Sequence, residues 1–141
     1  MKLPAQSLRF KTVLDNPNSL ITDMKQDKLG FFWLVNVSGL QKFDGVKRHT
    51  FLNDPGNPNS IASGQVSSLI IDTDNILWVG INGLGLDRLD PSTNTFTHFR
   101  HNAKDDYSLS NDTVNAILED HSGNLWVGTN QGLDLLDRKT G

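Results

Sequence analysis

The sequence predicts an all-β protein made of β-propeller blades, because one sequence unit is written three times. Segment 76–80, Ile-Leu-Trp-Val-Gly, returns at 124–128 as Asn-Leu-Trp-Val-Gly, and a looser copy at 31–35 is Phe-Phe-Trp-Leu-Val. The central tryptophans of the three copies are Trp33, Trp78 and Trp126. Their spacings of 45 and 48 residues are typical of propeller blades, small sheets that bury their faces only by stacking.

The second copy divides into four short strands separated by turn residues. Segment 72–75, Asp-Thr-Asp-Asn, predicts a turn, because aspartate bonds its own backbone and asparagine tolerates a left-handed conformation. Segment 91–94, Pro-Ser-Thr-Asn, predicts the turn between the last two strands. Four strands per repeat is the composition of a propeller blade. The expected strands are 66–71, 77–81, 85–90 and 95–99.

The other two copies follow the same plan but differ at the ends of the chain. The predicted blades are about 17–51, 58–99 and 106–141, the last of which lacks its outer strand. An extra outer-type strand is expected at 8–10, where Phe10 takes the place of Phe51 and Phe99. Together these make about three four-stranded antiparallel blades, an incomplete propeller, since closed propellers typically have about 4–8 blades. We therefore expect self-association or packing against the remaining blades of a parent propeller.

Composition excludes several classes of protein. The 141 residues are 36% hydrophobic, and no run approaches the roughly 18 apolar residues of a spanning helix. No direct membrane contact and no signal peptide are therefore expected in this sequence. The formal net charge of −3 argues against nucleic acid as a partner, because nucleic acid needs a basic stripe. The absence of cysteine excludes disulfides and thiolate catalysis.

The repeat resembles the two-component regulator propeller repeat. The second copy departs from that pattern at Asn75 and Ile81, and the first at Val35 and Asn36, where the family usually has Gly-Thr. The resemblance covers 8–141. In the third copy the matching residues are Leu109, Ser110, Val114, Ile117, Asp120, Gly123, Leu125, Trp126, Val127, Gly128, Thr129, Gly132 and Leu133.

The resemblance implies a non-catalytic sensor fragment of a bacterial membrane-bound signalling protein, located in the periplasm as part of an inner-membrane protein. The output domain of such proteins is usually a histidine kinase, often a hybrid with a response regulator, or a diguanylate cyclase. Similar sensors in gut Bacteroidetes respond to carbohydrate fragments, so a small oligosaccharide is an implied ligand. The alternative is an intracellular protein-interaction scaffold of the WD-repeat or kelch kind, which the Leu-Trp-Val-Gly motif disfavours.

Residues that recur in register are expected to serve packing and turns. A packing device must repeat in every blade, whereas a binding site need not. We therefore prefer packing between blades to sugar stacking as the role of the tryptophans. The structural repeat residues are Trp33, Trp78, Trp126, Gly80, Gly128, Asp72, Asp120, Gly85 and Gly132.

No catalytic, metal or cofactor site is expected, and hence no enzyme activity. His98 and His101 are the closest histidine pair, but an odd spacing places them on opposite faces of a strand. Asp27, Asp72 and Asp120 could include a glycosidase pair, yet they recur as turn formers. Nucleophile-elbow, phosphate-loop and zinc-protease motifs are all absent.

A ligand site is instead expected at the mouth of the propeller. Loops between strands vary freely there, and polar residues occupy corresponding positions in the three copies while the flanking strands stay apolar. The candidate ligand-binding residues are Asn36, Ser38, Asn82, Asn130 and Gln131.

Overall fold

The computed structural model describes residues 9–14 and 20–138, and within them the chain is all β, as predicted. Eleven strands form three antiparallel sheets, two of four strands and one of three. The strands are β1 (Asp23–Gln26), β2 (Phe32–Asn36), β3 (Gly39–Phe43), β4 (Arg48–Phe51), β5 (Val66–Ile71), β6 (Leu77–Ile81), β7 (Gly85–Asp90), β8 (Thr95–Phe99), β9 (Val114–Glu119), β10 (Leu125–Thr129) and β11 (Gly132–Leu136). The described residues contain no helix that could span a membrane.

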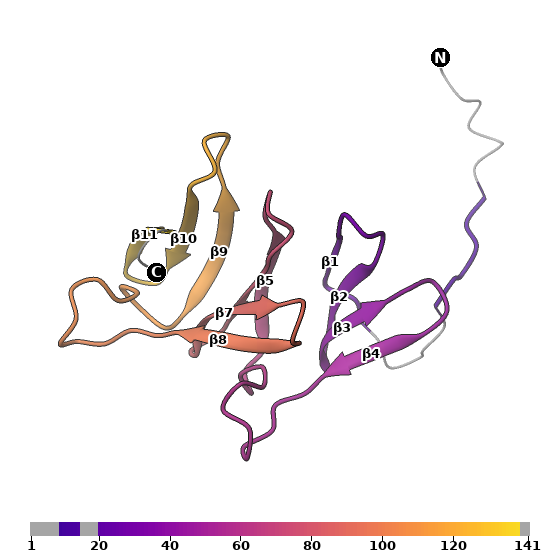
Figure 1. Ribbon diagram of the computed structural model, residues 1–141, viewed down its shortest axis with the longest axis horizontal. Helices are drawn as coiled ribbons and strands as arrows, with labels where there is room; N and C mark the ends of the chain where they lie inside the picture. Colours follow the sequence, from indigo (N-terminus) through magenta and orange to yellow (C-terminus); the bar gives the residue numbers. More distant parts are fainter. Residues whose placement is uncertain (1–8, 15–19, 139–141) are drawn as a thin grey trace.

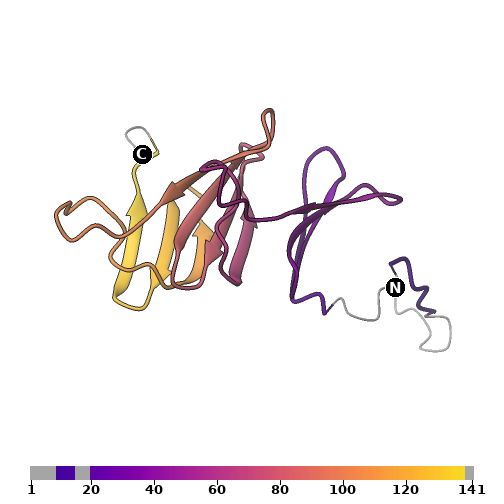
Figure 2. The ribbon, with the colours of Figure 1, turned by 90° about the horizontal axis from the view of Figure 1, so that it is seen from below.

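Each sheet is a meander in which strands that follow one another in sequence pair side by side. The four strands predicted in the second copy coincide with β5, β6, β7 and β8. The sheets lie in chain order along the molecule, with the second sheet in the middle (Figures 1 and 2). Their first strands contact one another, β1 against β5 and β5 against β9. This is the stacking expected of propeller blades, and the predicted fold class is confirmed.

Two apolar layers hold the three sheets together. The first layer lies between the first and second sheets and contains Trp33, Phe51, Leu69 and Phe96. The second lies between the second and third sheets and is built around Trp78. Every residue of β6 is buried, since this strand is covered on both faces. Burial of each large apolar side chain contributes roughly 1.5–3 kcal/mol, so stacking supplies the stability that a single sheet lacks.

The two ends of the chain differ from the middle. Residues 17–19 and 139–141 of the predicted blades lie outside the described residues, and so does Leu8 of the predicted strand at 8–10. Arg9 and Phe10 are not in a strand, and Phe10 is 100% exposed. An extended segment without a neighbouring strand forms no ladder of hydrogen bonds, so it gains nothing from the β conformation.

Candidate functional site

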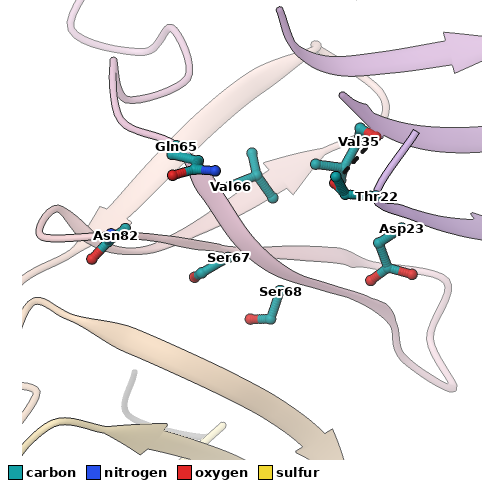
Figure 3. Close-up of a pocket in the computed structure, with 8 residues that line it drawn as sticks. All are labelled: Thr22, Asp23, Val35, Gln65, Val66, Ser67, Ser68 and Asn82. Atoms are coloured by element: carbon teal, nitrogen blue, oxygen red, sulfur yellow. Dashed lines mark hydrogen bonds between the residues drawn. The ribbon is translucent and has the colours of Figure 1, made fainter. Parts of the chain in front are cut away.

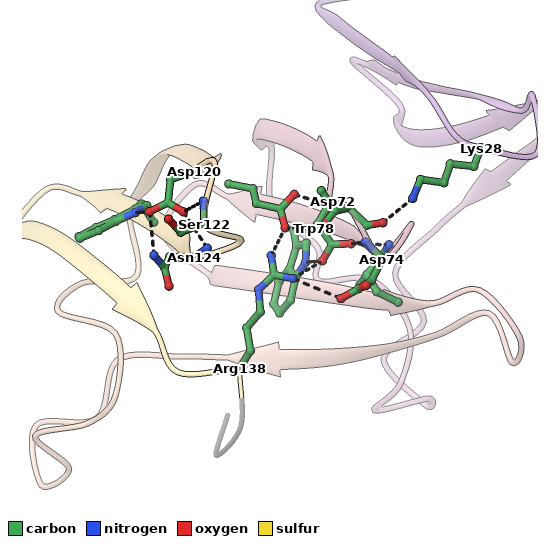
Figure 4. Close-up of polar contacts among 12 residues, drawn as sticks. Lys28, Asp72, Asp74, Trp78, Asp120, Ser122, Asn124 and Arg138 are labelled. Atoms are coloured by element: carbon green, nitrogen blue, oxygen red, sulfur yellow. Dashed lines mark hydrogen bonds and ion pairs between the residues drawn. The ribbon is translucent and has the colours of Figure 1, made fainter.

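An aspartate at the first turn of each sheet binds the tryptophan six residues later. In the second sheet, the Oδ2 atom of Asp72 accepts a hydrogen bond of 2.8 Å from Trp78 Nε1. Its Oδ1 atom accepts from the backbone N–H groups of Asp74 and Ile76, at 3.0 and 2.8 Å (Figure 4). The same pair recurs as Asp27 with Trp33 at 2.9 Å and Asp120 with Trp126 at 2.8 Å.

This aspartate–tryptophan pair holds the hairpin in place, and both oxygens of the carboxylate accept hydrogen bonds within it. Hydrogen bonds from Trp126 and Asn124 lower the pKa of Asp120 well below its ordinary value. Donors that favour the ionised form keep the side chain an acceptor at neutral pH. Each of the three recurring aspartates is therefore engaged as an acceptor within its own hairpin.

The tryptophans lie between sheets. Trp33 and Trp78 are each 3% exposed, and each packs against the sheet that follows its own. Trp126 is half-buried, because no described sheet follows the third. Lys42 and Arg88 lie over the rings of Trp33 and Trp78 at 5.3 and 5.9 Å from the centroids, within the range of a cation–π contact. Neither buried ring is available as a platform for a sugar.

Charged side chains also link one sheet to the next on the side of the first turns. Nη2 of Arg138 lies 2.9 Å from Glu119 Oε1, and its Nη1 lies 3.4 Å from Asp72 Oδ2 (Figure 4). Glu119 of the third sheet accepts hydrogen bonds from the backbone and hydroxyl of Thr73 in the second. Lys28 of the first sheet donates its ammonium to the carbonyl of Thr73. These bonds join all three sheets.

His98 and His101 have structural partners as well. His98 bonds Asp87 Oδ1 through Nδ1 at 2.7 Å and the carbonyl of Pro58 through Nε2 at 2.9 Å. His101 bonds the carbonyl of Leu109 through Nδ1 at 2.7 Å. The described residues include no group of three or more histidine, aspartate or glutamate side chains placed to hold a metal ion.

A pocket of about 350 Å³ lies at the end of the sheets where β1 and β5 begin and β2 and β6 end (Figure 3). Its walls come from the first and second sheets, and they combine hydroxyl and amide groups with one carboxylate and two valines. Its lining includes Thr22, Asp23, Val35, Gln65, Ser67 and Asn82. Such a mixture suits a neutral polar ligand that offers both hydroxyl groups and apolar patches.

The structure brings one of the predicted ligand residues into this pocket, Asn82. Asn36 is buried, and its Oδ1 atom accepts a hydrogen bond of 2.8 Å from the backbone N–H of Ser38 within the β2–β3 hairpin. Asn130 binds the side chain of Asn115 at 2.9 Å, and Gln131 is exposed in the β10–β11 hairpin. The other four predicted ligand residues, Asn36, Ser38, Asn130 and Gln131, lie outside the pocket lining.

Two pocket residues that the sequence did not single out, Thr22 and Gln65, stand just before the first strands of their blades. The backbone N–H of Asn82 donates to the Gln65 carbonyl at 2.9 Å, which holds the hairpin against the strand entry. Polar residues recur before the first strand as well as in the hairpin, and that recurrence was the available signal. It did not show which two blades would enclose a cavity.

The comparisons with known proteins agree with this architecture. Residues 108–131 match the family model of the two component regulator propeller. The extracellular domain of BT3049 from B. thetaiotaomicron, assigned to a hybrid two-component system, is 28% identical and superimposes with a TM-score of 0.80. The match covers 88% of this chain and 18% of that one. The predicted family resemblance is confirmed. No curated protein matches the chain.

More distant structures show the fold alone. The extracellular domain of BT4673 from B. thetaiotaomicron is 21% identical with a TM-score of 0.68, and the match covers 91% of this chain and 16% of that one. PorZ, a surface component of the type-IX secretion system of Porphyromonas gingivalis, is also 21% identical, with a TM-score of 0.66 and coverage of 86% and 18%. The chain thus spans less than a fifth of each of these proteins.

Proposed function

We propose that this chain, which carries the two-component regulator propeller repeat, belongs to the extracytoplasmic sensor region of a bacterial membrane-bound signalling protein. The similarity to the extracellular domain of a hybrid two-component system, over 88% of the chain, is the observation that carries the proposal. In its more specific form, the proposal is that the chain lies in the periplasm and that the output domain is a histidine kinase or a diguanylate cyclase.

The role of the chain in this proposal is recognition without chemistry. The recurring aspartates, His98 and His101 are engaged in structural hydrogen bonds, which supports a binding function over a catalytic one. Binding would act on the output domain by shifting the population of two arrangements of the sensor.

An oligosaccharide is the ligand that the pocket between the first two sheets supports best. Asn82 and Gln65 supply amide donors and acceptors, Ser67 and Thr22 supply hydroxyls, and Val66 supplies an apolar surface. Sugars present the complementary combination of hydroxyl groups and apolar C–H faces. The single carboxylate, Asp23, already accepts a hydrogen bond of 2.8 Å from Lys25, so the pocket carries little uncompensated charge.

Thermal unfolding in the presence of soluble oligosaccharides tests this proposal. A ligand that binds only the folded state raises the unfolding free energy by about 2.7 kcal/mol at 100 times its dissociation constant. We expect one class of glycan to raise the melting temperature, and Asn82→Ala and Gln65→Ala to abolish the rise.

Gln26→Ala is the matched control, because Gln26 is an exposed strand amide outside the pocket lining. It should leave the ligand-induced rise unchanged. If the ligand still raises the melting temperature of Asn82→Ala and Gln65→Ala, the ligand binds outside this pocket. If no glycan raises the melting temperature of the original chain, the ligand is not an oligosaccharide.

A further inference from the structure

The hairpin between β6 and β7 carries the single Asn-Gly pair of the sequence, Asn82-Gly83. Such a pair is chemically labile, because glycine has no Cβ atom to keep its backbone nitrogen away from the preceding side chain. Both residues are exposed, and a Cβ atom on Gly83 would meet nothing within 4 Å. The hairpin belongs to the middle sheet, which has a neighbouring sheet on each face. The exposure of the pair is therefore a property of the hairpin itself.

The other two sheets also carry an asparagine where their second strand turns into the third, but its side chain is held. Asn36 is 8% exposed, and its Oδ1 atom accepts a hydrogen bond of 2.8 Å from a backbone N–H of its own hairpin. Oδ1 of Asn130 accepts a hydrogen bond of 2.9 Å from the side-chain amide of Asn115. Within 9–14 and 20–138, neither the side-chain amide of Asn82 nor the backbone N–H of Gly83 has a hydrogen-bond partner. Only in the second hairpin are both groups free to approach each other.

The residue after the asparagine also differs among the three hairpins. It is Gly83 in the second, Val37 in the first and Gln131 in the third. A branched or long side chain shields the backbone nitrogen of its own residue, whereas glycine leaves that nitrogen open. Gly83 has a φ of +73°, a left-handed conformation that branched residues rarely adopt. The glycine that this turn requires is thus also the residue that opens its nitrogen to Asn82.

We propose that Asn82 is a site of spontaneous deamidation, through which the pocket between the first two sheets gains a carboxylate. The backbone nitrogen of Gly83 loses its proton and bonds to Cγ of Asn82, the Cγ–Nδ2 bond breaks, and Nδ2 leaves with that proton as ammonia. Water then opens the resulting cyclic imide at either carbonyl carbon, and the backbone nitrogen regains a proton. The product is aspartate or isoaspartate. Water is consumed, ammonia is released, and nothing is oxidised or reduced.

This modification changes the charge of the pocket. Asn82 lines the pocket from the second sheet, and Asp23 supplies its one carboxylate from the first (Figure 3). The lining contains no basic residue, and Lys25 already binds Asp23. A second carboxylate would have to give up water without a compensating partner when a neutral ligand enters. The deamidated chain should therefore bind such a ligand more weakly, a consequence that rests on the proposed function, whereas the deamidation does not.

Peptide mapping by mass spectrometry tests the assignment in the whole folded chain. The chain is incubated without ligand in warm, mildly alkaline buffer, because base removes the proton from the attacking nitrogen. Asn82 should lose its amide at least ~10-fold faster than Asn36 and Asn130, because only its successor lacks a Cβ atom. An Asn82 that keeps its amide, or one common rate for the three asparagines, would overturn the proposal.

Gly83→Asn tests the role of the glycine without disturbing the turn. Asparagine tolerates the left-handed conformation, as Asn75 and Asn94 do in this chain with φ values of 64° and 57°. The added side chain fills open space and shields the nitrogen, so Asn82 should be converted at least ~10-fold more slowly. Circular dichroism verifies the fold, and conversion at the original rate would contradict the role of Gly83.

Val37→Gly is the matched control, because it creates a second Asn-Gly pair in the hairpin where the asparagine is buried and hydrogen-bonded. Val37 is 72% exposed, so its removal costs little packing. In the folded variant, Asn36 should still be converted at least ~10-fold more slowly than Asn82, because its amide is held. The difference should disappear in urea, which unfolds both hairpins. Equal rates in the folded variant would overturn the assignment to a free amide.

Asn82→Asp separates the modification from the proposed function. A glycan that raises the melting temperature of the original chain should bind this variant at least ~10-fold more weakly, because the new carboxylate loses water on binding. Equal binding by the two chains would overturn the effect on the pocket. If no glycan binds either chain, the oligosaccharide proposal fails, while conversion of Asn82 in the mass spectrum still supports the modification site.

Discussion

The carboxylate that opens each first hairpin accepts two backbone N–H groups of its own turn and one indole N–H, and Asp120 also accepts from the side-chain amide of Asn124. In the buried case, Asp72 and Trp78 are each 3% exposed, and the indole bond spans 2.8 Å. A charged acceptor in such surroundings is costly unless its donors stay in place. The hydrogen bond therefore sets the position of the ring that packs between two sheets.

Trp78→Phe should lower the free energy of unfolding by about 1.5–3 kcal/mol through the lost hydrogen bond, with a further loss from the smaller ring. Urea unfolding followed by circular dichroism measures the change. In a double-mutant cycle with Asp72→Ala, the second substitution should cost much less than it does alone. Strictly additive effects would contradict a direct coupling between the two side chains.

The third hairpin makes a prediction about pH. Because Trp126 and Asn124 lower the pKa of Asp120 in the folded state, this group adds stability above its ordinary pKa of 3.8. That stability is lost as the pH falls from 3.8 through the lower folded-state value. Asp120→Asn should therefore be less stable than the original chain at neutral pH, and melting curves should show the difference narrowing below pH 3.8. A difference independent of pH would exclude this linkage.

The turn aspartates could be predicted from the sequence, since aspartate followed by asparagine or glycine is a turn pattern. The bond to tryptophan was not predicted. The constant interval of six residues in Asp27–Trp33, Asp72–Trp78 and Asp120–Trp126 was a signal for it. A spacing alone does not show that a side chain folds back over its own hairpin, because that depends on the backbone path of the turn.

At the scale of the strand, the lack of a side chain at Gly80 allows two sheets to approach each other. A Cβ atom on Gly80 in β6 would lie 2.5 Å from Ser68 Oγ and 2.8 Å from Val114 Cγ1 of the next sheet. A Cβ atom on Gly128, the same position in β10, would lie 3.7 Å from the Ala116 Cβ, an ordinary contact. The two repeat glycines are therefore unequal although the sequence motif around them is the same.

Gly80→Ala should destabilise the chain by about 1–3 kcal/mol, because the new methyl group overpacks the layer between the second and third sheets. Gly128→Ala should have a much smaller effect and is the matched control. Chemical denaturation of both variants gives the comparison. Equal losses would mean that the glycines serve backbone geometry common to both strands.

Strand positions in the second copy were predicted to the residue, because turn residues bracket every strand and period and length agree. A strand was also predicted at 8–10 from the pattern around Phe10, yet Arg9 and Phe10 lie outside any strand. The pattern of apolar and polar residues shows which face of a segment can be buried, whereas a strand forms only where a neighbouring strand can pair with that segment. For the same reason, the residues before β1 and β5 could not be assigned to a pocket.

At the scale of the whole molecule, self-association of the folded chain would make its stability depend on protein concentration. If folded copies associate, the folded oligomer is favoured by mass action, and the melting temperature should rise with protein concentration. Calorimetry at several concentrations tests this. A melting temperature that is the same at every concentration would speak against association of the folded chain.

The aspartate, its turn and its tryptophan all belong to one hairpin of about ten residues. A duplicated copy of the hairpin sequence would therefore bring its own aspartate–tryptophan hydrogen bond to any new position among the repeats. Blades can then be gained or lost as long as the faces of neighbouring blades pack against each other, as in other repeat proteins in which each repeat contacts only its neighbours. Blade number can vary in this way while the internal chemistry of each blade stays the same.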